Sequence, residues 1–210
     1  MAEGSSGQGA AGGLWMAYPP GPRPPLCTGR RSWEPRHVDE RASAPGRVLR
    51  DASGVRLELV GEWDVPVAQV WAALTAPSLT ARWFGTWTGD PATGTVLLRV
   101  AEDPDGGEQS VVVRECVPPH RLAVDLPSPD GTWPLSVDLT EQGGRTRLVL
   151  THRLTEPYDA SSIGPGWQYY RDRLGAVVTG TRVPDDWGAY EGLGAAYAVP
   201  RGPEQEQEQT

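Results

Sequence analysis

Residues 145–180 read RTRLVLTHRLTEPYDASSIGPGWQYYRDRLGAVVTG, and this stretch decides the fold. Its first ten residues alternate between apolar and polar, which is typical of a strand with one buried face. Its second half carries an apolar residue every three or four positions, which predicts an amphipathic helix. These helical positions are Ile163, Trp167, Tyr170, Leu174 and Val177. The Gly-Pro-Gly at 164–166 is predicted to break the chain before the helix, and Gly180 is predicted to cap it.

Upstream of this helix the sequence contains a series of short strand-like runs separated by turn residues. Five of them follow one another: TVLLRV (95–100), EQSVVVREC (108–116), RLAVDL (121–126), TWPLSVDLTE (132–141) and RTRLVLTHRL (145–154). Glycine- or proline-rich turns separate the runs, and several runs alternate cleanly between apolar and polar residues. Half-polar strands joined by short turns predict an antiparallel meander with one face in water.

The residues before the meander predict two more strands and two short helices. GRVLRDASGVRLELVGEW (46–63) is interpreted as two strands joined at the turn-forming cluster 51–54. VPVAQVWAALT (65–75) has apolar residues at helical spacing, and a second short helix is predicted from Ser78 to about Phe84. The fold class is therefore α+β: a curved antiparallel sheet wrapped around a long C-terminal helix, with two short helices.

Composition divides the 210-residue chain into one ordinary domain and its flanks. The chain contains 26 Gly and 21 Pro, a high share for a packed domain, and many of them lie in the N-terminal flank. Residues 1–46 are predicted to form a disordered Gly/Pro-rich arm, and residues 47–182 the folded domain. Residues 183–200 form an aromatic segment predicted to pack on that domain, and residues 201–210 a disordered acidic tail.

Charge and segment composition argue against several classes of protein. The formal net charge of −8 argues against a nucleic-acid binder, because phosphate contacts need a basic face. No apolar run is long enough to span a membrane, and the N-terminus lacks the pattern of a signal peptide. We therefore expect a cytoplasmic protein without a nucleic-acid or membrane partner. The start of translation remains open between Met1 and Met16.

A bent sheet covered by a single helix rarely fills its interior, so we predict a cavity between helix and sheet. Its lining is expected to be apolar and aromatic, which favours a small hydrophobic or aromatic ligand without a cofactor. The side chains predicted to contact this ligand come from the last strand, the helix ridge and the segment after the second short helix. They are Trp83, Phe84, Trp87, Leu148, Leu150, His152, Trp167 and Tyr170.

His152 is the polar residue of most interest, because strand alternation places it on the cavity face. It could be a structural histidine bonded to a Trp, a Tyr or the backbone, or a residue that orients the ligand or transfers a proton. A metal site is not predicted, because His120 lies in a proline turn and His37 in the arm. The two cysteines likewise indicate neither a disulfide framework nor a metal site.

The order and spacing of four motifs resemble the START-like (SRPBCC) superfamily, and within it the family of heat-shock protein 90 ATPase activator homologues. The motifs are VWAALTAPSLTARWFG (70–85), VRECVPPHRLAV (113–124), TRLVLTHRL (146–154) and GPGWQYYRDRL (164–174). The resemblance covers about Arg47 to Gly180. It implies a helix-grip fold with an internal hydrophobic cavity, and it fixes the fold better than the activity.

Three functions remain open at this point. The leading hypothesis is a START-like domain, monomeric or homodimeric, that binds a small hydrophobic ligand and carries no catalytic residues. The resemblance also implies a co-chaperone-like module that docks on a chaperone or another protein. A third reading is an enzyme like the polyketide cyclases or dehydratases of the superfamily, with His152, Tyr170 and Glu115 as candidate polar groups.

Overall fold

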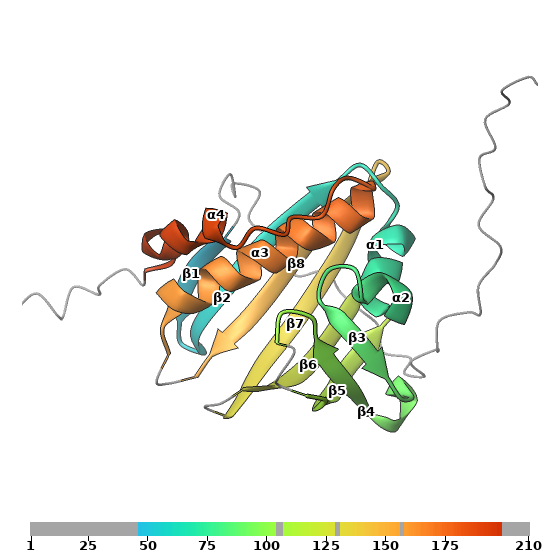
Figure 1. Ribbon diagram of the computed structural model, residues 1–210, viewed down its shortest axis with the longest axis horizontal. Coiled ribbons are helices and arrows are strands. Elements are labelled where there is room, and N and C mark those ends of the chain that lie inside the picture. Colours follow the sequence, from blue (N-terminus) through green and yellow to red (C-terminus); the bar gives the residue numbers. More distant parts are fainter. Residues whose placement is uncertain (1–45, 104–106, 129–130, 156–157, 199–210) are drawn as a thin grey trace, which may run out of the picture.

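An eight-stranded antiparallel sheet carries the fold of the computed structural model, which describes residues 46–103, 107–128, 131–155 and 158–198 (Figure 1). The strands lie in the order β1-β2-β8-β7-β6-β5-β4-β3. Their bounds are β1 Gly46–Asp51, β2 Gly54–Trp63, β3 Gly85–Thr88, β4 Thr95–Val100, β5 Gln109–Val117, β6 Arg121–Ser128, β7 Gly131–Gln142 and β8 Arg145–Leu154. The meander from β4 to β8 is confirmed, since each of these strands pairs with the next one along the chain.

Strand β3 is the element that the sequence analysis missed. The second short helix was predicted to reach about Phe84, but α2 spans only Pro77–Thr80, and the chain enters β3 at Gly85. The four residues of β3 pair with β4 at the edge of the sheet. Trp87 therefore lies on a strand and not in a loop, and its exposed neighbours Thr86 and Thr88 face outward while its own ring faces inward.

Three helices cover the concave side of the sheet. These are α1 Val67–Thr75, α2 and the long α3 Ala160–Thr179. The expected cap Gly180 is confirmed, with a left-handed φ of 70°. The expected break at 164–166 is wrong: α3 begins at Ala160, where the side chain of Asp159 accepts the Ser161 N–H at 3.0 Å, so Gly-Pro-Gly lies inside the helix.

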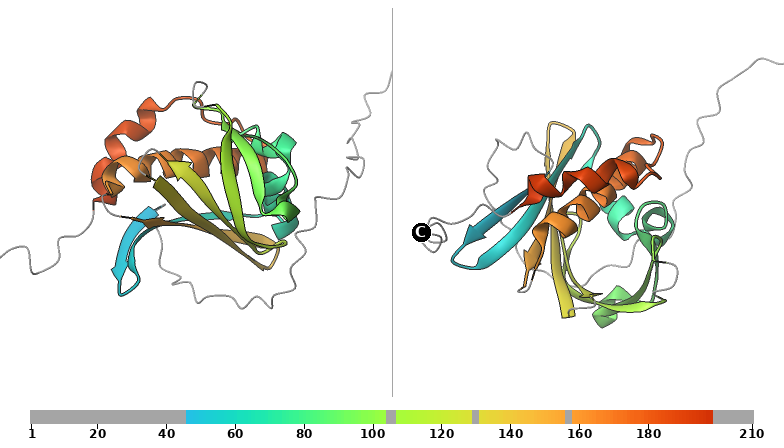
Figure 2. Two further views of the ribbon diagram at one scale, coloured as in Figure 1. Left: turned by 90° about the horizontal axis from the view of Figure 1, so that it is seen from below. Right: turned by 60° about the vertical axis from the view of Figure 1, so that its left-hand side comes forward.

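The position of α3 divides the sheet into two unequal halves. Figure 2 shows α3 lying along β1, β2 and β8, while the strands from β7 to β3 curl away from it toward α1 and α2. On the α3 side the interior is filled by side chains such as Leu148, Val70 and Leu174. The curled half has α1 and α2 above it and is the part of the fold with room inside.

The C-terminal segment lies against the outer side of α3. It contains α4 Gly188–Glu191 and the 3-10 turn η2 Gly192–Tyr197. The hydroxyl of Tyr190 donates to Asp172 Oδ2 at 3.0 Å, and that of Tyr197 donates to Gln168 Oε1 at 2.5 Å. The predicted arm up to residue 45 and the tail 201–210 lie outside the described residues.

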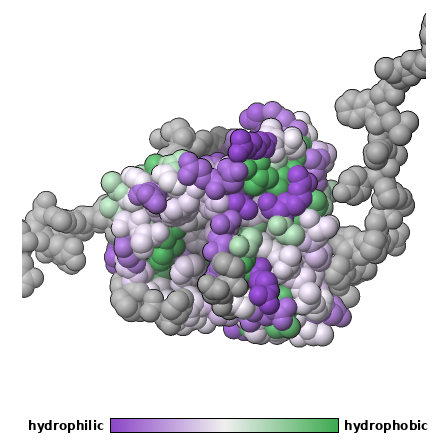
Figure 3. Space-filling view, in the orientation of Figure 1, coloured by the Kyte–Doolittle hydropathy of each residue, from purple (hydrophilic) through white to green (hydrophobic). Residues whose placement is uncertain are grey.

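Hydrophilic residues dominate the face shown in Figure 3, with small apolar patches between them. Among the described residues, the large apolar side chains that are well exposed are Leu97 and Trp187. In the same part of the chain, no helix combines the length and the apolar character needed to cross a bilayer.

Candidate functional site

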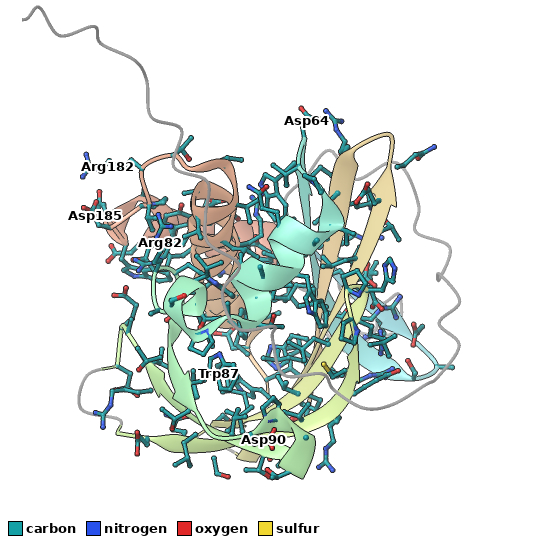
Figure 4. The ribbon with its side chains drawn as sticks, turned by 90° about the vertical axis from the view of Figure 1, so that its right-hand side faces the viewer. Asp64, Arg82, Trp87, Asp90, Arg182 and Asp185 are labelled. Atoms are coloured by element: carbon teal, nitrogen blue, oxygen red, sulfur yellow. The ribbon has the colours of Figure 1, made fainter. Side chains whose placement is uncertain are left out.

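A cavity of about 210 Å³ lies in the curled half of the sheet, under α1 and α2. Its floor is built by the inward apolar side chains of β4 to β8, and its walls by the two short helices, β3 and one residue of α3. Figure 4 looks into this region and shows Trp87 inside the arch formed by the strands and the short helices. The lining includes five aromatic residues: Trp71, Trp83, Phe84, Trp87 and Trp167.

The aromatic wall is held in place by hydrogen bonds to its neighbours. Trp83 Nε1 donates to the Ala73 carbonyl at 2.9 Å, which ties the segment after α2 to α1. From the other side, Arg173 Nε on α3 donates to the Trp83 carbonyl at 2.9 Å. Phe84 packs between Trp83 and Trp167, with ring centroids 5.3 and 6.2 Å away. The wall is therefore fixed to α1 and to α3 before any ligand binds.

Hydroxyl groups in the lining are few, and those of its two threonines are already bonded to protein. Thr75 Oγ1 donates to the Trp71 carbonyl at 2.8 Å, and Thr80 Oγ1 lies 3.1 Å from the Pro77 carbonyl. Ser136 lies between Leu135 and Val137, whose side chains face the cavity, so its own side chain points to the opposite face of β7. Among the described residues, no charged side chain is part of the lining. The site is thus an apolar cavity without an ion-pairing group.

His152 lies behind this wall, fully buried, with an exposed fraction of 1%. Its Nδ1 accepts the indole N–H of Trp167 at 3.0 Å, and the ring of Trp133 lies 5.0 Å away between centroids. An accepting Nδ1 places the imidazole proton on Nε2. Burial lowers the pKa of His152 from 6.5 to about 4, so the ring is neutral near pH 7. Of the two roles left open for His152, this geometry fits the structural histidine bonded to a tryptophan.

Five of the eight predicted ligand contacts line the cavity. They are Trp83, Phe84, Trp87, Leu150 and Trp167. The other three lie outside the lining. Leu148 packs in the filled half of the interior, His152 lies behind Trp167, and Tyr170 lies behind Phe84, with its ring edge-on at 4.9 Å between centroids. Contact of any of these residues with a ligand stays a prediction.

Sequence reasoning did not name the floor residues on β4 to β7. Examples are Leu98 on β4, Val111 on β5, and Val124 and Leu126 on β6. The alternation in RLAVDL already placed Val124 and Leu126 on one face. The missing information was which half of that face the helix covers.

The residues considered for acid–base catalysis do not meet in the cavity. Glu115 forms an ion pair with Arg121 at 2.8 Å and, in register with Ala123, lies on the convex face of the sheet. Burial raises the pKa of Tyr170 to about 12, which keeps its hydroxyl protonated. His152 and Tyr170 are both outside the lining. Across the described ranges, no group of three or more His, Cys, Asp or Glu side chains is arranged to hold a metal ion.

A family model described as "Activator of Hsp90 ATPase homolog 1-like protein" matches residues 64–179. Among solved structures, the chain is similar to CalU16 from Micromonospora echinospora, with 25% identity and a TM-score of 0.57 over 72% of this chain and 92% of that one. It is also similar in fold to a conserved protein of unknown function from Enterococcus faecalis, with 16% identity and a TM-score of 0.58 over 72% and 88% of the two chains. No curated protein matches the sequence.

Proposed function

The chain belongs to the family of Activator of Hsp90 ATPase homolog 1-like proteins, a START-like (SRPBCC) family. From this membership and the geometry of the site, we propose that it binds a small, uncharged, hydrophobic or aromatic molecule in the cavity beneath α1 and α2. The proposal assigns it no catalytic step. The bound molecule would lie against Trp83, Phe84 and Trp167 and over the apolar floor of β4 to β8.

The observation that carries this proposal is an apolar cavity of about 210 Å³ in an otherwise packed interior. An apolar cavity of about 150 Å³ in another protein stays free of water and binds benzene. The larger volume suits a fused two-ring aromatic compound. Such a ligand gains free energy from the apolar surface that it removes from water, about 25 cal/mol per Å².

The charge inventory of the lining limits the class of ligand. An ion that enters an apolar site without a partner loses its hydration and gains nothing in return. Because no Arg, Asp, Glu or His side chain of the described ranges lines the cavity, a carboxylate or an ammonium group would have to stay at the mouth. The role proposed for His152 is therefore to hold Trp167 as part of the wall.

Naphthalene is the probe that tests the proposal. We expect its addition to the purified protein to change tryptophan emission, because four tryptophans line the cavity, and to raise the thermal midpoint by mass action. Val124→Trp places an indole over the floor of the cavity and is expected to weaken naphthalene binding by about tenfold or more. The matched control is Thr86→Trp, which adds the same side chain to the exposed face of β3.

The proposal fails if a series of one- to three-ring aromatic probes changes neither emission nor thermal midpoint. It also fails if Val124→Trp remains folded, as judged by circular dichroism and its unfolding transition, and binds naphthalene as tightly as Thr86→Trp does.

A further inference from the structure

Four tryptophans line the cavity, and their indole N–H groups fall into two classes. The indole N–H of Trp83 donates to the Ala73 carbonyl, and that of Trp167 donates to His152 Nδ1. The indole N–H groups of Trp71 and Trp87 donate to no acceptor among the described residues. The lining thus contains two indole donors with no protein partner in the described ranges.

These two nitrogens are not fully enclosed by protein. In the described part of the chain, the side-chain nitrogens that are both buried and unpartnered belong to arginines, Arg147 and Arg171. Trp71 and Trp87 Nε1 therefore keep some accessible surface. Trp71 is only 6% exposed as a residue, Trp87 faces inward from β3, and both residues line the cavity. Figure 4 shows Trp87 in this interior position.

No other group in the described lining offers a comparable proton. Cys116 also lines the cavity, but it is disulfide-bonded, which the sequence analysis did not predict, and so it carries no S–H. The hydroxyl hydrogens of Thr75 and Thr80 are directed to helix carbonyls, and the side chain of Ser136 lies on the other face of β7. Among the described side chains of the lining, the donors left for a carbonyl or ether oxygen of an apolar ligand are the indole N–H groups of Trp71 and Trp87. A ligand without an acceptor would leave both N–H groups unpaired in an apolar site, which costs free energy.

We propose that the cavity selects an uncharged cyclic or aromatic ligand that carries an acceptor oxygen, and that the indole N–H groups of Trp71 and Trp87 recognise this oxygen. This inference rests on the proposed function, because it assigns the ligand class of the same cavity. It identifies Trp71 and Trp87 as specificity-determining residues and Trp83 and Trp167 as wall residues.

Indane and 1-indanone are matched probes, because they share the fused ring skeleton and differ by one carbonyl oxygen. Their dissociation constants are measured by calorimetry for the wild type and for Trp71→Phe, Trp87→Phe and the double variant. Phenylalanine keeps an aromatic ring and removes the donor. We expect the double variant to bind 1-indanone about tenfold more weakly than the wild type does, while indane binding changes by about twofold or less. The control is Trp83→Phe, whose N–H is already committed, and it is expected to affect both probes equally.

The outcomes separate this inference from the proposed function. If neither probe binds to the wild type, both proposals fail. If both probes bind and the double variant weakens them by the same factor, the cavity is a binding site but the donor assignment is wrong. A second measurement does not depend on the variants: in the wild type, the indole ¹⁵N–¹H signals of Trp71 and Trp87 should move downfield with 1-indanone and not with indane. Equal shifts with both probes would also overturn the assignment.

Discussion

Gly164→Ala is expected to destabilise the protein by about 3 kcal/mol, although alanine normally favours a helix over glycine. The reason is the ring of Tyr197, which lies directly on the backbone of α3. A Cβ atom at position 164 would lie 2.2 Å from Cγ of Tyr197 and 2.4 Å from its Cδ1. Carbon atoms do not approach this closely, so either the ring or the helix would have to move.

The ring of Tyr197 has little room to move away. It is 1% exposed, its other edge lies over Gly46 on β1, and its hydroxyl donates to Gln168. A Cβ at Gly46 would lie 2.5 Å from the same ring. The substitution at 164 is therefore expected to release the segment 192–197 from α3. The loss in the free energy of unfolding cannot exceed the free energy with which the segment 192–197 packs on α3.

Gly166→Ala is the matched control, because it changes the same residue type in the same helix, and apart from its chain neighbours and the backbone of its own helix no atom lies within 4 Å of the new Cβ. We expect it to alter the free energy of unfolding by about 1 kcal/mol or less, in the stabilising direction. In a Tyr197→Ala background, the cost of Gly164→Ala should fall to about 1 kcal/mol, left by the contact between the added methyl group and the ring of Pro165. Urea unfolding measures all four variants. Equal effects of the two glycine substitutions in the wild-type background would contradict this account.

This pair of residues shows what the sequence could not reveal about α3. Glycine and proline usually interrupt a helix, and the pattern at 164–166 was interpreted in that way. In the structure the helix continues through them, and Gly164 is the site where a residue 33 positions later packs. A contact between residues this far apart leaves no local periodicity, so no reading of the helix alone predicts it.

Most of the sheet could be predicted because its signal is local. Alternation in RLAVDL and in RTRLVLTHRL is a direct consequence of strand geometry, and it placed the correct side chains on the concave face. Strand β3 was missed because four residues are too few for a clear alternation.

The candidate site was only partly predictable, because alternation gives the face of a sheet and not the position along it. Leu148 and Leu150 share a face of β8, but α1 and α3 cover Leu148 while Leu150 reaches the cavity. That difference is set by where α3 crosses the sheet. For the same reason, the floor on β4 to β6 was not named.

The second large effect is expected from the pH. Protonation of His152 should reduce the free energy of unfolding by about 3 kcal/mol as the pH falls from above 6.5 to below 4. Its pKa is lowered to about 4 in the folded protein because burial disfavours the charged ring, while in the unfolded chain it is near 6.5. Between these values the unfolded state binds a proton that the folded state does not. The stabilising contribution is therefore complete above pH 6.5 and is lost on acidification.

His152→Gln isolates this contribution from the carboxyl groups that titrate in the same range. Glutamine has an oxygen that can accept the Trp167 N–H, and it does not titrate. The free energies of unfolding of the wild type and the variant are measured in urea from pH 7.5 to pH 4. Over this range the wild type should lose about 3 kcal/mol more than the variant does, because only the wild type loses the histidine contribution. Parallel curves would mean that His152 has the same pKa in the folded and the unfolded protein and is not buried away from water.

Protonation of His152 in the folded protein, which occurs near pH 4, is also expected to affect the proposed ligand site. A protonated imidazole has no acceptor at Nδ1, so Trp167 would lose the partner that fixes it in the cavity wall. Because the folded protein takes up this proton only near pH 4, naphthalene binding to the folded wild type should stay constant down to about pH 5 and weaken as the pH falls through 4. In His152→Gln it should stay constant over the same range. If the association constant of naphthalene falls equally in the wild type and in His152→Gln, the group responsible is not His152, and the position of Trp167 does not depend on the imidazole.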